Sequence, residues 1–483
     1  MKINLFFYSF IPLFFLFFPA MCLPLGNKPI AIFFIISTLF MGLYILFSFK
    51  HFIHQIIYII KYTPFKFFFY WCLWCLVSGI FLVLTNKYSF THFIYYYILY
   101  LLINIAIPLS IPIFTIKNFS HLKIFIKFYI IMLFIVFSIG FVNFLSTSLN
   151  IKFVQDLFCN LIVNERSFSG GLNTVVTYGT KVYSVFAEPG WFGGFICLNL
   201  PIIYSLSTSK YKIFTNTSID IFIKRAVIIM ALCNLILTKS PIWLIFSILT
   251  IVFLNWKNIL NSFKKSYICY LLIFLGLCGI FFNSKILALD FSETYLNRII
   301  TTIKTDDYNN FVFAEASLAS RITSYYNSLR LLEVYPITGT GLGNSKFYMA
   351  NMFLTSKLPL TMENYRNLIE SYSIGYLRFN GAFFYESLSE TGIIGFIFIY
   401  IYLLFLIKTL KKYKIYLKGI YKNFATGINK SILIFLPISL YDIGFRVTYM
   451  WLIFGIANLL IIIAQNEYKY SLIEKKENSN EKI

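Results

Sequence analysis

Long apolar runs alternate with short charged or polar segments along most of the chain. A helix needs about 20 apolar residues to cross roughly 30 Å of hydrocarbon. Twelve runs come near that length: 4–23, 29–49, 67–86, 92–116, 122–147, 184–206, 225–239, 241–256, 267–284, 388–407, 431–445 and 447–465. The pairs around Lys239 and Arg446 could each be one long bent helix or a re-entrant hairpin. The pattern therefore predicts an all-α polytopic membrane protein with ten to twelve transmembrane helices.

The composition agrees with lipid as the main solvent. Of the 483 residues, 59% are hydrophobic and 12% are charged, whereas soluble domains carry about 25% charged residues. An ordinary soluble protein is thereby excluded. The net charge of +22 is interpreted first as a signal of membrane orientation, and no nucleic-acid partner is expected.

The basic residues gather on one side of the predicted membrane. If Lys2 is cytoplasmic, that side also holds segments 50–66, 117–127, 207–225, 257–266, 408–430 and the tail after 465, with 25 of the 41 basic residues and 5 of the 19 acidic ones. The opposite side is nearly neutral, so the positive-inside rule places both termini in the cytoplasm. The first apolar run also resembles a signal peptide, but the residues around Ala20 make a poor cleavage site, and we expect an uncleaved span.

Two long outer segments interrupt the spans. The predicted organisation is N-terminal transmembrane helices 1–147, a first outer loop 148–183, central helices 184–284, a large outer loop 285–387, C-terminal helices 388–465 and a cytoplasmic tail 466–483. Long loops rich in aromatic residues are usually functional. In the large loop, apolar positions recur every three or four residues from Glu315 to Tyr335, which predicts an amphipathic helix on the outer leaflet that ends at Pro336.

Arginine is concentrated on the outer side. Of eight Arg residues, only Arg225 is assigned to the cytoplasm; the others are Arg166, Arg298, Arg321, Arg330, Arg366, Arg378 and Arg446. Because the planar guanidinium binds phosphate through two parallel hydrogen bonds, the set favours an anion such as pyrophosphate, although outer carboxylates could pair with individual members. Neither outer loop contains histidine, so a general base there must be a carboxylate, and we expect neither a metal site nor a cofactor.

Three motifs place polar groups next to predicted spans. Glu188 precedes Pro189 at the outer mouth of a span, where it is either functional or only a helix cap. The Gly-rich segment 336–344 could form an anion nest or simply turn the chain back to the membrane. Glu386 and Glu390 are four residues apart and so share a helix face, as an acid pair or as partners of Arg378 and Arg321.

These motifs, in this order, resemble the O-antigen polymerases of the Wzy type, within the polymerase and ligase superfamily that uses undecaprenyl-diphosphate-linked glycans. The elements are Phe186-Ala187-Glu188-Pro189, then Ser320-Arg321 leading through the amphipathic helix to Gly339-Thr340-Gly341-Leu342-Gly343, and finally Glu390-Thr391-Gly392-Ile393-Ile394-Gly395. The resemblance covers about residues 150–460. It departs from many relatives at Lys181, where arginine is expected.

The resemblance implies a GT-C-like fold in the bacterial inner membrane and a glycosyltransferase activity. The growing glycan would move from undecaprenyl diphosphate to the next lipid-linked repeat unit at the outer face, with membrane lipid, a flippase and a chain-length regulator as partners. The implied roles are Arg321 for the pyrophosphate, Arg166 and Arg378 assisting it, Glu188 or Glu390 as base or orienting group, and Lys181, Arg330 and Glu386 in substrate binding.

Two other functions are consistent with the same span count. A flippase or transporter of lipid-linked oligosaccharide explains the spans, but not the long outer loop with its surface helix, and no internal repeat is visible. An O-antigen ligase differs in its acceptor, but such ligases carry a His-Asn pair where this chain has Asn380-Gly381-Ala382.

Overall fold

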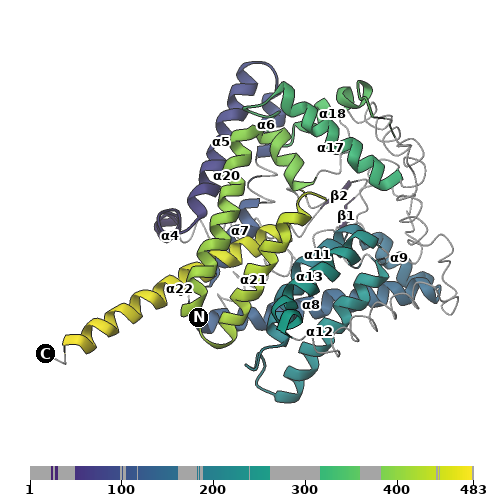
Figure 1. Cartoon of the computed structure of the whole chain (residues 1–483). Helices are drawn as coiled ribbons and strands as arrows, with labels where there is room; N and C mark the ends of the chain where they lie inside the picture. Colours follow the sequence, from purple (N-terminus) through teal and green to yellow (C-terminus); the bar gives the residue numbers. More distant parts are fainter. Residues whose placement is uncertain are drawn as a thin grey trace.

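The structure is a computed structural model, and the residues it describes are mostly helical (Figure 1). These residues are 23–25, 28–30, 49–97, 101, 105–116, 118–161, 182, 184, 186, 189–238, 240–261, 316–358, 360, 382–441, 444 and 447–480. The helices are α4 Phe49–Tyr62, α5 Phe65–Leu84, α6 Phe90–Tyr96, α7 Ile107–Thr115, α8 Phe119–Ser148, α9 Lys152–Leu161, α11 Pro189–Ser207, α12 Thr217–Leu237, α13 Pro241–Asn261, α17 Ala316–Val334, α18 Ser345–Leu354, α20 Phe383–Tyr413, the short 3₁₀ helix η4 Lys414–Tyr416, α21 Gly419–Ile438 and α22 Thr448–Asn480.

Five described helices are long and apolar enough to cross a membrane. They are 65–84, 119–148, 190–207, 383–416 and 449–473, and a shorter apolar helix covers 242–255. The chain is therefore a multi-pass membrane protein with a helical body. Five spans of this kind are fewer than the predicted twelve, and the predicted spans 4–23 and 267–284 lie essentially outside the described residues.

Several predicted boundaries are wrong. The start of predicted span 29–49 is a strand, because β2 (Lys28–Ile30) pairs antiparallel with β1 (Leu23–Leu25). Predicted span 92–116 is not one described helix but contains α6 and α7, and Pro108 and Pro112 remove backbone donors there. Helices α12 and α13 are separate, as in the two predicted spans 225–239 and 241–256, but α12 begins at Thr217, eight residues before the predicted start.

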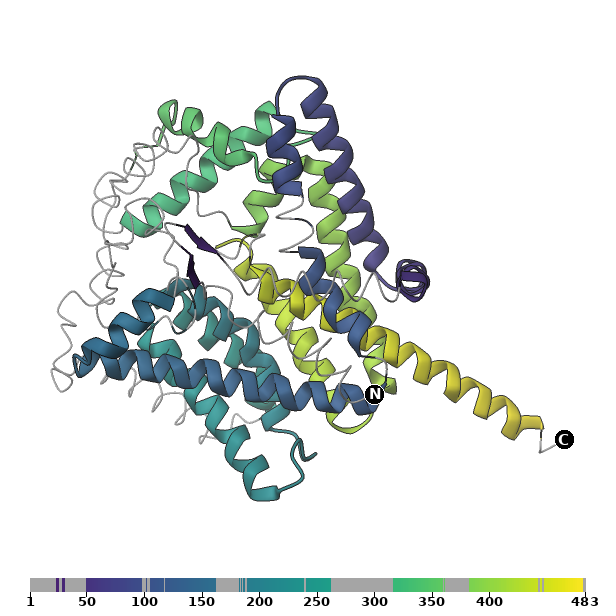
Figure 2. The same ribbon diagram turned by 180° about the vertical axis from the view of Figure 1, so that it is seen from behind.

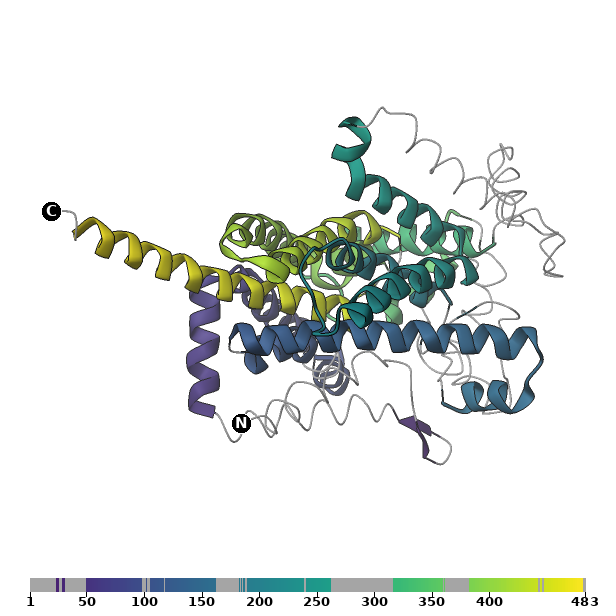
Figure 3. The same cartoon turned by 90° about the horizontal axis from the view of Figure 1, so that it is seen from below.

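The C-terminal helices also differ from the predicted spans. Helix α21 begins at Gly419, twelve residues before the predicted start, and ends at Ile438. Helix α22 continues to Asn480, so the predicted cytoplasmic tail extends the last helix instead of leaving it at residue 465. Its far end projects away from the other helices (Figures 1 and 3). The helix predicted in the large loop is present as α17, which ends before Pro336 as predicted. Its expected apolar face is not confirmed, because its buried positions include Ser324, Asn327 and Ser328, whereas Leu329 is exposed.

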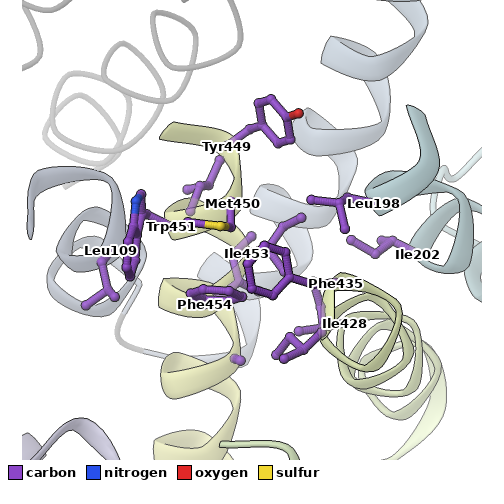
Figure 4. Close-up of a cluster of buried hydrophobic side chains, with 14 of the residues drawn as sticks. Leu109, Leu198, Ile202, Ile428, Phe435, Tyr449, Met450, Trp451, Ile453 and Phe454 are labelled. Carbon is purple, nitrogen blue, oxygen red and sulfur yellow. The ribbon is translucent and has the colours of Figure 1, made fainter. Parts of the chain in front are cut away.

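Helix α22 is the centre of the hydrophobic core. Figure 4 shows its Trp451 and Phe454 among side chains of α7, α11 and α21. Helix α7 approaches so closely that a Cβ at Gly455 would lie 2.2 Å from the carbonyl oxygen of Leu109. Small residues allow this in lipid, where helix association depends on close packing and a few hydrogen bonds. One such bond joins Asn458 Nδ2 to the hydroxyl of Tyr402 on α20, at 2.7 Å.

The helices of the large predicted loop lie at one end of this body. Helices α17 and α18 lie beside the turn between α5 and α6, on the side away from the end of α22 (Figures 1 and 2). Helix α17 packs along both α18 and α20. The large loop is thus fixed, in its described part, against the membrane-spanning helices.

Candidate functional site

The Gly-rich loop after α17 is paired with a break in α20. Gly392 has φ +66° and ψ −175°, a conformation that only glycine adopts readily, and it interrupts the helix. The freed backbone groups pair with the loop: Thr340 N–H donates to Ser389 O at 2.8 Å, and Ile393 N–H donates to Pro336 O at 2.9 Å. A Cβ at Gly392 would lie 2.0 Å from the oxygen of Ile337. Loop and helix break therefore form one unit.

Glu390 closes this unit with its carboxylate. Gly343 N–H donates to Oε2 at 2.8 Å, and the hydroxyl of Ser345 donates to Oε1 at 2.7 Å. Glu390 is 6% exposed. One backbone N–H of the loop and the Ser345 hydroxyl thus hold one anion, which is a side chain of the same protein. Since both oxygens accept hydrogen bonds here, this geometry holds Glu390 in one orientation and suits an orienting role better than proton transfer.

The turn between α5 and α6 packs on the other side of the loop. Tyr88 donates its hydroxyl to Leu342 O at 2.8 Å, and the ring of His92 stacks on Phe347 at 4.9 Å. From within α5, Trp74 Nε1 donates to the carbonyl of Thr391 at 2.8 Å. The N-terminal half of the chain therefore supports both the loop and the helix break.

Arg321 lies at the opposite end of α17, over an aromatic cluster. Its guanidinium carbon is 4.7 Å from the centre of the Tyr441 ring, a cation–π contact. One turn on, Tyr325 donates its hydroxyl to the carbonyl of Tyr441 and stacks on Tyr385 with ring centres 4.4 Å apart. The contacts fix Arg321 where α17, α20 and the segment between α21 and α22 meet.

Glu386 belongs to the same region. It follows Tyr385 on α20, is buried, and faces Gly444, where an added Cβ would lie 2.4 Å from Oε2. Glu386 and Glu390 share a helix face as predicted, but their carboxylates meet different elements.

A chain of aromatic contacts leads from Arg321 to the start of α11. The ring of Tyr441 meets Trp243 of α13 edge to face at 6.1 Å, and Trp243 packs against Gly193 and Gly194. From there, Tyr449 contacts Phe186 at 6.0 Å. The element ending in Glu188-Pro189 therefore begins beside the same cluster, although Glu188 itself lies outside the described residues.

The predicted site residues are divided by these positions. Arg321 and Glu386 lie near the segment between α21 and α22, which contacts both. Glu390 lies one turn further along α20, where it accepts hydrogen bonds from Gly343 and Ser345. Arg330 lies elsewhere: it donates from Nη1 to Met352 O at 3.0 Å and from Nη2 to the Thr355 hydroxyl at 3.1 Å, and so ties α17 to the end of α18. Those contacts are structural. Arg166, Lys181, Glu188 and Arg378 lie outside the described residues.

Sequence reasoning missed the groups that hold these residues in place. Ser345 directly follows the Gly-rich run at the start of a helix, which is a usable signal for an anion contact. Tyr441 and Gly444 lie inside predicted span 431–445, beyond Ile438, where α21 ends, and nothing in the sequence connects them with Arg321. That contact depends on tertiary structure alone.

The residues around Tyr441 and the Gly-rich loop supply a fixed cation, buried carboxylates and aromatic faces. Among the described residues, no group of three His, Cys, Asp or Glu side chains could hold a metal ion. Such a set can bind an anion and orient a sugar. Comparison of the chain with protein-family models and with curated proteins finds no match.

Proposed function

We propose that this protein is a polymerase of lipid-linked oligosaccharide repeat units at the outer face of the bacterial inner membrane, with a GT-C-like fold. The observation that carries the proposal is the convergence of three sequence elements on one end of the helical body. Helix α17 contacts α20 directly through the stacked rings of Tyr325 and Tyr385, and Arg321 lies over the ring of Tyr441. The Phe186 element before α11 is linked to Tyr441 indirectly, through Trp243 and Tyr449.

The reaction is a glycosyl transfer. A hydroxyl of the incoming repeat unit attacks the anomeric carbon of the growing glycan, the bond from that carbon to the diphosphate oxygen breaks, and undecaprenyl diphosphate leaves. The departing diphosphate needs positive charge, and the attacking hydroxyl must lose a proton to a base. Arg321 serves the first need, with Arg166, Arg378 and Lys181 assisting.

A carboxylate serves as the base. Both oxygens of Glu390 accept hydrogen bonds from the loop, so Glu390 acts as a positioning residue and Glu188 is the preferred base. Glu386, beside the Tyr325 and Tyr385 rings, acts in substrate binding. Membrane lipid, a flippase and a chain-length regulator complete the expected partners.

The test compares Arg321→Ala with Arg225→Ala, the same change on α12 at a distant edge of the body (Figures 1 and 2). At equal membrane levels, Arg321→Ala is expected to leave only single repeat units on lipid A core, because the leaving diphosphate loses its cation, while Arg225→Ala keeps the polysaccharide ladder on a gel. Wild-type chain lengths with Arg321→Ala would refute the role of this residue.

Deletion of the gene tests the function itself. Single repeat units on lipid A core indicate a polymerase. Long chains left on undecaprenyl diphosphate would instead indicate a ligase, and repeat units retained on the cytoplasmic side would indicate a flippase.

A further inference from the structure

Tyr441 lies just beyond the end of α21, in a segment whose backbone is held against α20. Two residues before it, the carbonyl of Ser439 accepts a hydrogen bond from Phe384 N–H at 3.0 Å. Three residues after it, Gly444 leaves room for the carboxylate of Glu386, since an added Cβ would lie 2.4 Å from Oε2. The chain is therefore anchored to one helix on both sides of Tyr441.

The ring of Tyr441 is held from a second helix, α13. Trp243 meets it at 6.1 Å with the two ring planes nearly perpendicular, at 87°, and Phe246 of the same helix lies at 6.2 Å. Aromatic rings at such distances prefer defined relative orientations. Backbone and ring together make Tyr441 a fixed surface.

Two residues on one face of α17 meet this surface at different atoms. Arg321 places its guanidinium carbon 4.7 Å from the centre of the Tyr441 ring, and Tyr325 donates its hydroxyl to the Tyr441 carbonyl. Because residues four apart share a helix face, the contact of Tyr325 fixes the face of α17 that carries Arg321. The ring and the carbonyl of one residue thus set where the guanidinium lies.

An aromatic ring suits a cation that has to bind an anion. A carboxylate neutralises a guanidinium and occupies its N–H donors, whereas a ring attracts it through the quadrupole of the π system and leaves its formal charge in place. Arginine also has many rotamers, and a side chain that is already held in one of them loses less entropy when its ligand binds.

We propose that Tyr441 is a positioning residue, whose ring holds the Arg321 guanidinium in place for a diphosphate group. The ring carries this role, because the contact with Arg321 is made by the ring. The diphosphate as ligand rests on the proposed function, whereas the hold of Tyr441 on Arg321 does not.

The first test measures how fast phenylglyoxal modifies individual arginines of the full-length protein in detergent, by peptide mass spectrometry. Tyr441→Leu is expected to raise the rate at Arg321 about fivefold, because the side chain loses the contact that holds it, and to leave the rate at Arg330 unchanged. Tyr441→Phe keeps the ring and should keep the wild-type rate. The matched control is Tyr421→Leu, which removes a half-buried ring packed on Phe119 near the start of α21 and should change neither rate.

The second test measures the affinity of the same proteins for inorganic pyrophosphate by isothermal titration calorimetry. Tyr441→Leu should bind it about tenfold more weakly than the wild type, while Tyr441→Phe and Tyr421→Leu should bind it equally well. Arg321→Ala should bind it more weakly still.

The two tests separate failure of this inference from failure of the proposed function. An unchanged rate at Arg321 in Tyr441→Leu would overturn the positioning role, and so would equal acceleration at Arg321 and Arg330, which would indicate a general loosening of the fold. Wild-type pyrophosphate affinity in Arg321→Ala would instead refute the diphosphate as the ligand, and with it the role of Arg321 in the proposed function.

Discussion

Replacing Glu390 by alanine removes the acceptor for two buried donors, the N–H of Gly343 and the hydroxyl of Ser345. Hydrogen bonds to a charged group contribute about 1.5–3 kcal/mol each, so the loss is roughly 3–6 kcal/mol. Glu390→Gln keeps the volume and one acceptor, and the Ser345 hydroxyl can turn to accept from the new amide, so its cost is roughly 1–2 kcal/mol. Ser345→Ala removes one bond at a similar cost.

The assay has two readouts, the apparent Tm of the detergent-purified protein and the polysaccharide ladder in cells. The expected order of Tm is wild type, then Glu390→Gln together with Ser345→Ala, then Glu390→Ala lowest. Glu333→Gln, which changes an exposed glutamate on α17, is the matched control and should leave both readouts unchanged.

The ladder separates positioning from proton transfer. A glutamine cannot take the proton of the attacking sugar hydroxyl, but it keeps most of the hydrogen bonding to Gly343 and Ser345. A positioning role for Glu390 therefore predicts that Glu390→Gln retains a ladder. Loss of the ladder in Glu390→Gln with a Tm near that of the wild type would make Glu390 the base and refute this reasoning. An unchanged Tm in Glu390→Ala would show that the loop does not depend on the carboxylate.

Three further predictions concern stability. Arg330→Ala should destabilise the protein by roughly 2 kcal/mol, measured as a lower Tm, because it removes the tie to the end of α18; retention of the ladder distinguishes this tie from substrate binding. Gly392→Ala should lower the free energy of unfolding by at least about 2 kcal/mol, because the positive φ at this position strains an L residue and the new Cβ would overlap Ile337. Normal membrane levels of this variant with an unchanged Tm would contradict the helix break at Gly392. Asp220→Asn should lower the Tm at pH 7, because it breaks the buried ion pair with Lys224, a loss of roughly 3 kcal/mol in the free energy of unfolding. The Tm difference between this variant and the wild type should narrow only below about pH 4.

The direction of this last pH dependence follows from the environment of Asp220 at the start of α12. Burial acts to raise the pKa of the carboxyl, but Lys224 and the backbone N–H groups of Phe214 and Ile213 outweigh it, and the pKa is lowered overall. A carboxyl with a depressed pKa in the folded state stabilises fully above its unfolded pKa of about 3.9, and this contribution is lost as the pH falls further. A gap that instead narrowed near pH 7 would contradict this assignment.

Local features of the sequence determined the class of fold. Apolar length predicted the helices α5 and α8 closely, because a lipid-embedded segment must satisfy its own backbone and therefore forms a helix. The periodicity of the large loop predicted α17, and Pro336 predicted its end, since proline cannot continue the hydrogen-bond ladder. The motif pattern also selected Arg321, Glu386 and Glu390 as residues of interest.

Tertiary structure decided what these residues contact. The Gly392 break exists because the Pro336–Gly343 loop supplies the partners that the interrupted helix loses, and those partners lie about 50 residues away in sequence. For the same reason Glu386 and Glu390, identical in type and one turn apart, face Gly444 and the Gly-rich loop respectively. Helical spacing fixes which side chains share a face, but only the packing of distant segments fixes what that face meets.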